Sequence, residues 1–306
     1  MKDSVGDLMT SDVTVISGTD DLQELERLLL REGVHGVPVV DDAGRIVGVG
    51  RGVKNLETAL SRGIIDEYSH DAKTAVEGAD FVLIATPVDT IQDVVEAIAP
   101  SLEQGAVVTD VGSVKGAVVE LVEPLMPEGV FFVGAHPVAG TEQSGADAAF
   151  PTLFRDRVCI ITPTVNTDPE ALNKVQKVWE GTGSRVVEMD GERHDLLLAS
   201  ISHLPHVVVY ALVNTVAGGG EESTTALNYS AGGFADFTRI ASSSPEMWRD
   251  ICLLNREALL DLIGQFQKKV EVLKELIAGG DGAGLLERFR EAKDFRDLLK
   301  ESGESV

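Results

Sequence analysis

The chain has 306 residues, of which 50 are acidic and 26 basic, and its formal net charge is −24. A length of this order suggests two domains, and 43 % hydrophobic residues are enough for a sizeable core. Such a large negative charge repels nucleic acid, so a nucleic-acid partner is not expected. The two cysteines, Cys159 and Cys252, cannot form a disulfide framework, which favours a reducing, cytoplasmic setting. We expect neither a signal peptide nor a membrane-spanning helix, because no apolar run reaches roughly 18 residues.

The first 50 residues are predicted to form a segment of their own. Their pattern predicts strands at Val13–Ile16, Val37–Val40 and Arg45–Val49, and a helix over Asp20–Glu32. The sequence Asp41–Gly44 separates the last two strands and is typical of a hairpin turn.

Residues 51–190 are predicted to alternate strands and helices. Five short apolar runs without alternation are typical of buried parallel strands: Phe81–Ala85, Ala106–Val111, Val130–Gly134, Cys159–Thr162 and Arg185–Met189. Between the first two runs, Asp89–Leu102 has apolar residues at helical spacing. This βαβ pattern predicts a doubly wound α/β sheet.

Residues 191–306 lack strand signals and are predicted to be helical over 191–217, 245–278 and 281–300. Ser244, Pro245 and Glu246 together form a good helix start, with an N-cap, a first-turn proline and a first-turn carboxylate. The predicted division is therefore 1–50, 51–190 and 191–306.

Polar residues follow three of the predicted strands. Ligands of an open parallel sheet bind at the carboxyl ends of its strands. The first strand is followed by Thr86 and Pro87, the second by Gly112 and Ser113, and the third by the run from His136 to Glu142. Ordinary turn chemistry explains any one of these, but three at one sheet edge favour a ligand site.

The helical half contains a second polar cluster. His203 and His206 share a helix face, and Pro205 between them should kink the helix or start a new one. A satisfied, buried histidine pair is the alternative, and no metal is expected because a convincing third ligand is missing. Arg239 follows a Gly-rich entry and suits a carboxylate, although a surface ion pair is also open.

Four strings, in this order, resemble the prephenate/arogenate dehydrogenase family. They are Asp110–Lys115, His136–Glu142, Ser202–His206, and Asp236–Ala241 followed by Trp248. The resemblance covers residues 46–300. It implies a Rossmann-like parallel sheet followed by an all-helical dimerisation domain, and a homodimer. It also implies oxidative decarboxylation of prephenate (or arogenate) with NAD or NADP, in tyrosine biosynthesis.

The resemblance also implies roles for individual residues. His136 would be the catalytic base, with Ser113 beside the reacting hydroxyl and the nicotinamide. Arg239 would grip a substrate carboxylate. The remaining substrate-binding residues would be His203, His206, Thr141, Glu142, Asp236 and Trp248, and the cofactor-binding residues would be Arg51, Thr86, Pro87 and Ser113.

The chain departs from the family at its start, where a strand, a G-x-G-x-x-G turn and a helix should cradle the pyrophosphate. No such turn is present, since the run Gly48–Val53 has Val at the third glycine position. Residues 1–50 instead resemble one CBS repeat, in Val5–Thr10, Gly36–Val40 and Asp42–Gly48. Two functions therefore stay open: an NAD(P)-dependent dehydrogenase, or a nucleotide-sensing regulatory protein built on a catalytically dead dehydrogenase.

The cofactor preference follows from the end of the predicted second strand. An acid at this position binds the ribose hydroxyls of NAD, whereas an arginine suits the 2′-phosphate of NADP. Here Arg51 is present without an acid, and Lys54 adds a second cation. We therefore expect NADP to be preferred over NAD, with weak binding of either because the glycine turn is missing. The alternative is that Arg51 is a solvated loop residue.

Overall fold

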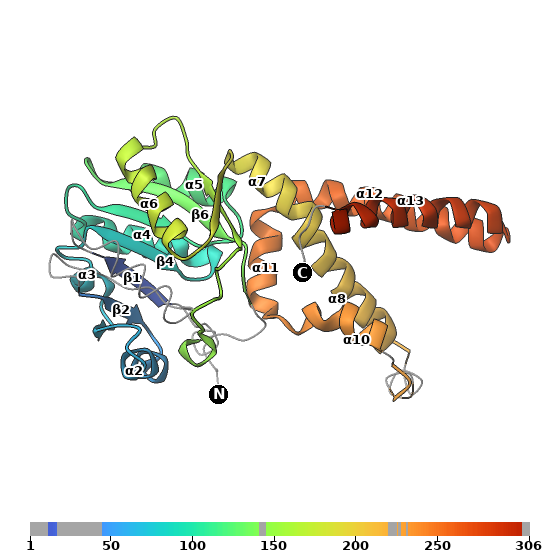
Figure 1. Ribbon diagram of the computed structural model, residues 1–306, viewed down its shortest axis with the longest axis horizontal. Helices are drawn as coiled ribbons and strands as arrows, with labels where there is room; N and C mark the ends of the chain where they lie inside the picture. The colour runs from blue at the N-terminus through green and yellow to red at the C-terminus, as the bar shows by residue number, and fades with distance from the viewer. Residues whose placement is uncertain are drawn as a thin grey trace. The chain divides into compact units, whose positions relative to one another are not determined.

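The computed structural model describes residues 12–16, 45–140, 145–219, 225, 228–230 and 232–301 (Figure 1). The helix predicted at 20–32, the strand at 37–40, the hairpin turn at 41–44, and Thr141 and Glu142 lie outside the described residues.

The core of the molecule is an eight-stranded sheet with the order β3-β2-β1-β4-β5-β6-β7-β8. Its strands are β1 (Asp12–Ile16), β2 (Val47–Gly50), β3 (Glu67–Ser69), β4 (Phe81–Ala85), β5 (Val107–Asp110), β6 (Phe131–Pro137), β7 (Val158–Thr162) and β8 (Arg185–Glu188). Each of the five apolar runs predicted in residues 51–190 forms one of these strands. The short strand β3 was not predicted, because three partly exposed residues give no apolar run.

The predicted parallel sheet is confirmed at its centre, but the run that forms β7 departs from the predicted parallel direction. Strands β4, β5 and β6 are parallel, but β7 is antiparallel to β6, and β8 then runs parallel to β7. A parallel return needs a long crossover, usually a helix. The described part of the β6–β7 connection contains instead one short turn, η5 (Ala146–Ala148). Strand β8 is also less buried than predicted, because it lies at the edge of the sheet.

Strand β1 occupies the position of the first strand of a doubly wound sheet but has the opposite direction. It lies between β2 and β4 and is antiparallel to both. Asp12 pairs with Gly50 and Ala85, at the carboxyl ends of β2 and β4, and Ile16 pairs with Phe81 at the other edge. The chain therefore leaves β1 at the edge opposite to the one where ligands of such sheets bind.

Helices cover both faces of the sheet, as a doubly wound fold requires (Figure 1). One buried cluster includes Leu56 of α2 (Val53–Ser61) and Trp179 of α6 (Pro169–Gly181). The other includes residues of α4 (Ile91–Ile98) and α5 (Gly116–Val122), and α3 (Ala72–Ala75) lies on the same side.

The helical part after the sheet begins with α7 (Gly191–Leu198), a π turn η6 (Ala199–His203) and α8 (Leu204–Ala217). Pro205 lies in the first turn of α8, so the break predicted there is confirmed. Next come α10 (Gly232–Thr238), η7 (Arg239–Ser242) and α11 (Pro245–Leu254). The predicted N-cap is confirmed, because Ser244 Oγ accepts a hydrogen bond from the Met247 N–H at 3.3 Å.

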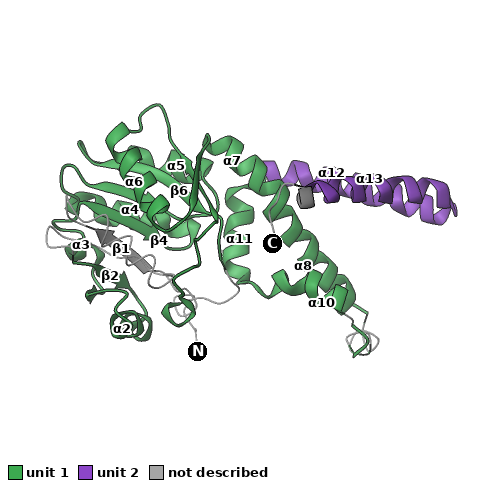
Figure 2. Cartoon of the chain, viewed as in Figure 1, with its two compact units in different colours: residues 1–256 green, residues 257–306 purple. Residues whose placement is uncertain are grey.

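The helix predicted over 245–278 is interrupted at Asn255, and α12 (Arg256–Ala278) begins after it. Together with α13 (Gly282–Glu301), α12 belongs to a second compact unit of residues 257–306, whereas residues 1–256 form the first (Figure 2). The predicted domain boundaries at residues 50 and 190 stay a prediction.

Candidate active site

A buried ion pair fixes the turn that follows β5. The side chains of Lys115 and Asp110 are fully buried, and Lys115 Nζ pairs with Asp110 Oδ2. The same carboxylate accepts hydrogen bonds from the N–H groups of Gly112, at 2.8 Å, and Ala135, at 3.2 Å. Burial lowers the pKa of Lys115, and the Asp110 carboxylate opposes this effect. This turn therefore holds the half-buried Ser113 in a defined place at the strand end.

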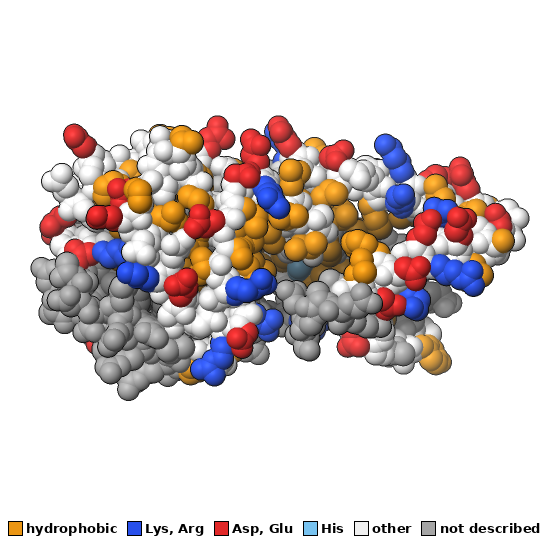
Figure 3. Space-filling view, turned by 45° about the horizontal axis from the view of Figure 1, so that its top comes forward, with side chains coloured by type: hydrophobic (Ala, Val, Ile, Leu, Met, Phe, Trp, Pro, Cys, Tyr) orange, Lys and Arg blue, Asp and Glu red, His pale blue; other side chains and the backbone are white. Residues whose placement is uncertain are grey.

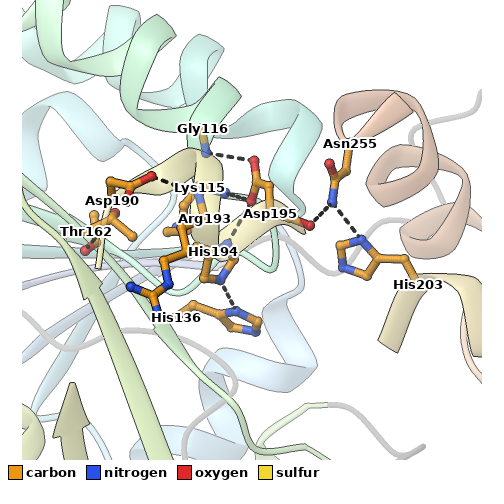
Figure 4. Close-up of polar contacts among 12 residues, drawn as sticks. Lys115, Gly116, His136, Thr162, Asp190, Arg193, His194, Asp195, His203 and Asn255 are labelled. Carbon is orange, nitrogen blue, oxygen red and sulfur yellow. Dashed lines mark hydrogen bonds and ion pairs between the residues drawn. The ribbon is translucent and has the colours of Figure 1, made fainter. Parts of the chain in front are cut away.

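His136 lies near the end of β6 and is buried, with 7 % of its surface exposed. Its Nδ1 lies 2.7 Å from Nε2 of His194 on α7, and His194 Nδ1 lies 2.7 Å from Asp195 Oδ1 (Figure 4). Burial lowers the pKa of His136 well below its usual value, and His194 and Lys115 lower it further. The imidazole is therefore neutral at neutral pH and able to accept a proton.

Sequence reasoning missed His194 and Asp195. The two residues lie one turn into a helix that begins after the N-cap Asp190, and they carry no motif of their own. They are 58 or more positions away from His136 in the chain. The sequence did contain one signal, an adjacent His-Asp pair at the start of the helical part. Only the fold brings this pair into contact with His136 of β6.

Three predicted residues of the helical part lie together. The ring of His206 stacks on Trp248, with centroids 3.4 Å apart, and the ring of His203 meets Trp248 edge-on at 6.0 Å. Burial lowers the pKa of His203 to about 4. Within the described part of the chain, His203 Nε2 and Trp248 Nε1 are buried without a hydrogen-bond partner. Buried orphan polar atoms of this kind mark a place where a ligand or water binds.

Asn255 connects this group to the buried histidine pair. Its Nδ2 donates to the carbonyl oxygen of Asp195 at 2.8 Å and lies 3.0 Å from Nδ1 of His203 (Figure 4). The two polar clusters predicted separately thus belong to one buried network.

The structure does not bury Arg239 and Asp236 with these histidines. Asp236 lies on α10 and Arg239 on η7, both exposed to solvent, and η7 packs against α8. Thr141 and Glu142 lie in the part of the chain that is not described. The predicted grouping of the carboxylate-binding residues around His136 therefore stays a prediction.

The predicted cofactor residues follow the carboxyl ends of β2, β4 and β5. Thr86 is buried at the end of β4, and its Oγ1 has no hydrogen-bond partner within the described ranges. Pro87 then leads into the short turn η2 (Val88–Thr90), while Arg51 is exposed after β2. Thr86 and Ser113 thus follow the ends of two neighbouring strands, β4 and β5, and their predicted contact with the nicotinamide stays a prediction. A cradle for its pyrophosphate is not provided by the described residues, because β1 leaves the sheet at the opposite edge.

A doubly wound sheet with a buried neutral histidine and hydroxyl side chains at its strand ends, continued by a helical part, is typical of dinucleotide-dependent dehydrogenases. Residues 41–188 match the model for the nucleotide-binding domain of prephenate dehydrogenase, and residues 190–291 match the model for its dimerisation domain. The chain belongs to the prephenate dehydrogenase family.

Similar proteins cover most of the chain. It is 40 % identical over 249 residues to a cyclohexadienyl dehydrogenase of Zymomonas mobilis, covering 81 % of this chain and 84 % of that one. It is 37 % identical over 256 residues to a prephenate dehydrogenase of Bacillus subtilis, covering 83 % and 69 %. The crystal structure of prephenate dehydrogenase from Aquifex aeolicus with hydroxyphenyl propionate and NAD+ has a TM-score of 0.79 and 36 % identity, covering 91 % and 93 %.

The predicted CBS resemblance is also confirmed, since residues 5–49 match the model of a CBS domain. This match overlaps that of the nucleotide-binding domain at residues 41–49. The overlap includes the start of β2, so this strand belongs to both patterns, as predicted for Arg45–Val49.

Proposed function

We propose that the chain oxidises the ring alcohol of prephenate, or of a closely related cyclohexadienyl substrate such as arogenate, with loss of carbon dioxide. The observation that carries this proposal is His136, a buried neutral imidazole at a strand end whose Nδ1 is engaged by His194. Its other nitrogen, Nε2, remains as the acceptor of a proton. The relatives named for these activities support the choice of substrate.

The chemistry needs a base for the hydroxyl proton and an acceptor for the hydride. His136 Nε2 takes the proton as the carbon–oxygen bond gains double-bond character. NAD or NADP, when bound, accepts the hydride. Ser113, in the fixed turn after β5, orients the hydroxyl toward His136. The bond between the ring and its carboxylate then breaks with loss of carbon dioxide. Its electron pair moves into the ring, which becomes aromatic as the carbonyl oxygen takes up a proton and becomes the phenol.

Substrate binding is assigned to the helical part. His203 and His206, held by Trp248, offer polar nitrogen atoms beside an apolar ring, which suits a carboxylated ring substrate. Arg239 offers a guanidinium fork for a carboxylate. Three further residues are proposed to support Arg239 or to border the ligand: Asp236, Thr141 and Glu142.

We infer a homodimer formed through the helical part. The stretch Gly191–Ala217 is 27 residues long, and its most apolar window of 18 residues has a mean hydropathy of 1.8, which by length and composition alone would also suit a membrane helix. Only 22 % of this window is buried, although the whole stretch includes the buried residues His194, Asp195 and His203. A second copy of the chain is the occupant that fits this apolar face, because the stretch belongs to the matched dimerisation domain. We also infer a cytoplasmic location, in keeping with the free thiols of Cys159 and Cys252.

The experiment is the reduction of NAD and NADP by the purified full chain on addition of prephenate or arogenate, compared with the His136→Asn variant. We expect turnover in the wild type and a loss of about 10²–10⁴-fold in kcat in the variant, because this is the usual contribution of a positioned base. Thermal unfolding should show that the variant is folded. Near-wild-type turnover in the variant would remove His136 from the mechanism.

A second function has support from the N-terminal segment. The CBS match and the reversed direction of β1 both favour a nucleotide-sensing protein in which the dehydrogenase part no longer turns over. No reduction of either dinucleotide by the wild type, together with measurable binding of AMP or ATP, would favour this alternative.

A further inference from the structure

His136, His194 and Asp195 form a hydrogen-bonded chain that runs from β6 into α7. The three residues are buried, and both ring contacts are 2.7 Å long (Figure 4). A contact of this length between two imidazole rings requires one nitrogen to donate and the other to accept. Only one of the two rings can therefore carry the hydrogen that they share.

The surroundings of Asp195 decide the direction of these hydrogen bonds. Its Oδ1 accepts from the Lys115 N–H and its Oδ2 from the Gly116 N–H, both at 2.8 Å. These backbone groups can only donate, and they lie at the amino end of α5, which favours a negative charge. The carboxylate is therefore an acceptor toward His194 as well, so His194 donates from Nδ1.

The tautomers of both histidines follow from this. A neutral His194 that carries its hydrogen on Nδ1 presents a lone pair on Nε2. His136 must then donate from Nδ1 to His194, which leaves the lone pair of His136 on Nε2. Nε2 is the nitrogen to which the proposed mechanism delivers the substrate proton.

Two glycines allow Asp195 to reach this position. A Cβ at Gly116 would lie 2.9 Å from Asp195 Oδ2, and a Cβ at Gly191 would lie 3.1 Å from the Cα of Gly116. The starts of α5 and α7 thus touch through backbone atoms. This contact fixes the carboxylate relative to the turn that carries Ser113.

We propose that His194 and Asp195 are positioning residues that fix the tautomer of His136, so that its Nε2 is the proton acceptor. The inference rests on the proposed role of His136 in the dehydrogenase reaction. When the substrate proton arrives at Nε2, the positive charge on His136 is stabilised by its Nδ1–H bond to His194 and, through that ring, by the Asp195 carboxylate. No proton has to leave Asp195, and no further reactant is needed.

The first test reads the tautomers without turnover. The full chain labelled with 15N-histidine is examined by long-range 1H–15N correlation at neutral pH, and the signals are assigned with His136→Gln and His194→Gln variants. We expect both rings to be neutral with the hydrogen on Nδ1. A His136 ring with its hydrogen on Nε2, or an imidazolium at either position, would overturn the proposal.

The second test compares two replacements of His194. His194→Gln keeps a polar atom near the place of Nε2 that can accept from His136, whereas His194→Phe keeps bulk without an acceptor. We expect kcat to fall about 10–100-fold more in the Phe variant than in the Gln variant with KM little changed, because a wrong tautomer removes the base rather than the substrate. Equal kcat in the two variants would contradict the proposal.

A third variant addresses the carboxylate and has a matched control. Asp195→Asn should produce a mixture of His136 tautomers and a reduced kcat, because the amide cannot accept from His194 and from both backbone groups. Asp168→Asn removes the same charge at α6, where Asp168 also accepts two backbone N–H groups, at 2.9 Å each. It should leave the His136 tautomer unchanged. If His136→Asn leaves turnover intact while the tautomers are as expected, the proposed role of His136 as the base fails and the tautomer assignment stands.

Discussion

At the scale of single residues, the Lys115–Asp110 pair is joined to the strand that carries His136, because Asp110 accepts a hydrogen bond from the N–H of Ala135. Both side chains are fully buried, and each loses its hydration on folding. A buried pair of this kind contributes little net stability compared with an apolar replacement, but removing one partner leaves a buried charge without compensation. The pair also places a cation near the base, where it lowers the pKa of His136.

We therefore predict that Lys115→Met lowers the free energy of unfolding by about 3–5 kcal/mol, because Asp110 is left without its cation. The double variant Lys115→Met/Asp110→Leu should recover part of this loss. Urea unfolding followed by circular dichroism measures the free energy of unfolding of the four proteins in the cycle, which are the wild type, the two single variants and the double variant. Additive effects of the two changes would show that the pair is not coupled.

Arg239 lies on η7 and is exposed, so its guanidinium is accessible to a carboxylate ligand. We predict that Arg239→Ala raises KM for prephenate at least tenfold and changes kcat much less. A charged hydrogen bond contributes about 1.5–3 kcal/mol, and 1.4 kcal/mol is a factor of ten. Arg239→Lys should recover only part of the affinity, because an ammonium cannot make the bidentate contact. An unchanged KM would exclude Arg239 from carboxylate binding.

At the scale of elements, the strands were predictable where the sequence is continuously apolar. The runs at Phe81–Ala85 and Val107–Asp110 are buried on both sides and fall where predicted. Strand direction was not predictable, because an apolar run carries no information on which way it pairs. The reversal of β1 and β7 depends on the connections, and these are set by tertiary packing.

The candidate site was predictable to a similar extent. Motifs identified His136, His203, His206 and Trp248, and the last three do lie together. Asp195 could not be identified, because its function comes from contacts with the start of α5, about 80 positions earlier. A role that depends on distant contacts leaves no local pattern.

The apolar surface of the helical part predicts how two chains associate. Leu196, Leu197 and Ile201 are large hydrophobic residues with exposed side chains on α7 and η6, and Ile201 is 71 % exposed. Hydrophobic side chains also gather in groups on the face drawn in Figure 3, with charged side chains among and around them. Large exposed apolar patches on a folded protein mark interaction sites.

We predict that the full chain is a dimer at micromolar concentration and that Ile201→Glu converts it to a monomer, because the interface would then bury an unpaired charge. The matched control is Val165→Glu, a fully exposed apolar residue after β7, which should leave the dimer intact. Light scattering coupled to size exclusion measures the mass. A monomeric wild type would refute the prediction, and a dimeric Ile201→Glu variant would place the interface elsewhere.

At the scale of the whole molecule, three buried histidines link stability to pH. The pKa values of His136, His194 and His203 are lowered on folding, mainly by burial. The unfolded chain therefore binds more protons than the folded chain once the pH falls below the unfolded value of about 6.5. The stability that the folded chain has with neutral histidines is fully present above that pH. It is lost as the pH falls toward the pKa of each histidine in the folded chain, which is about 4 for His203.

We predict that the free energy of unfolding of the first compact unit decreases between pH 7.5 and 5.5, by up to about 1.4 kcal/mol per pH unit for each histidine. Urea midpoints across this range measure the slope. His203→Gln should reduce the slope, because one titrating group is removed, although the variant is less stable at every pH. A slope of zero, or a gain of stability toward acid, would contradict the assignment of these histidines as buried and neutral.

The two halves of the sheet edge where a dinucleotide would bind differ from each other. We expect the nicotinamide half at Thr86, whose buried hydroxyl has no hydrogen-bond partner among the described residues, and at Ser113 after β5. The pyrophosphate half should begin with a glycine turn after β1, but β1 runs the other way and the sequence has no such turn.

We predict weak binding, with NADP preferred over NAD because Arg51 and Lys54 follow the end of β2. Calorimetric titration of the full chain with both dinucleotides measures each affinity, and Arg51→Ala should remove the preference for NADP while leaving the affinity for NAD unchanged. Tight binding of NAD, at about micromolar affinity or better (roughly −8 kcal/mol), would contradict the prediction and show that the N-terminal segment supplies a phosphate site of its own.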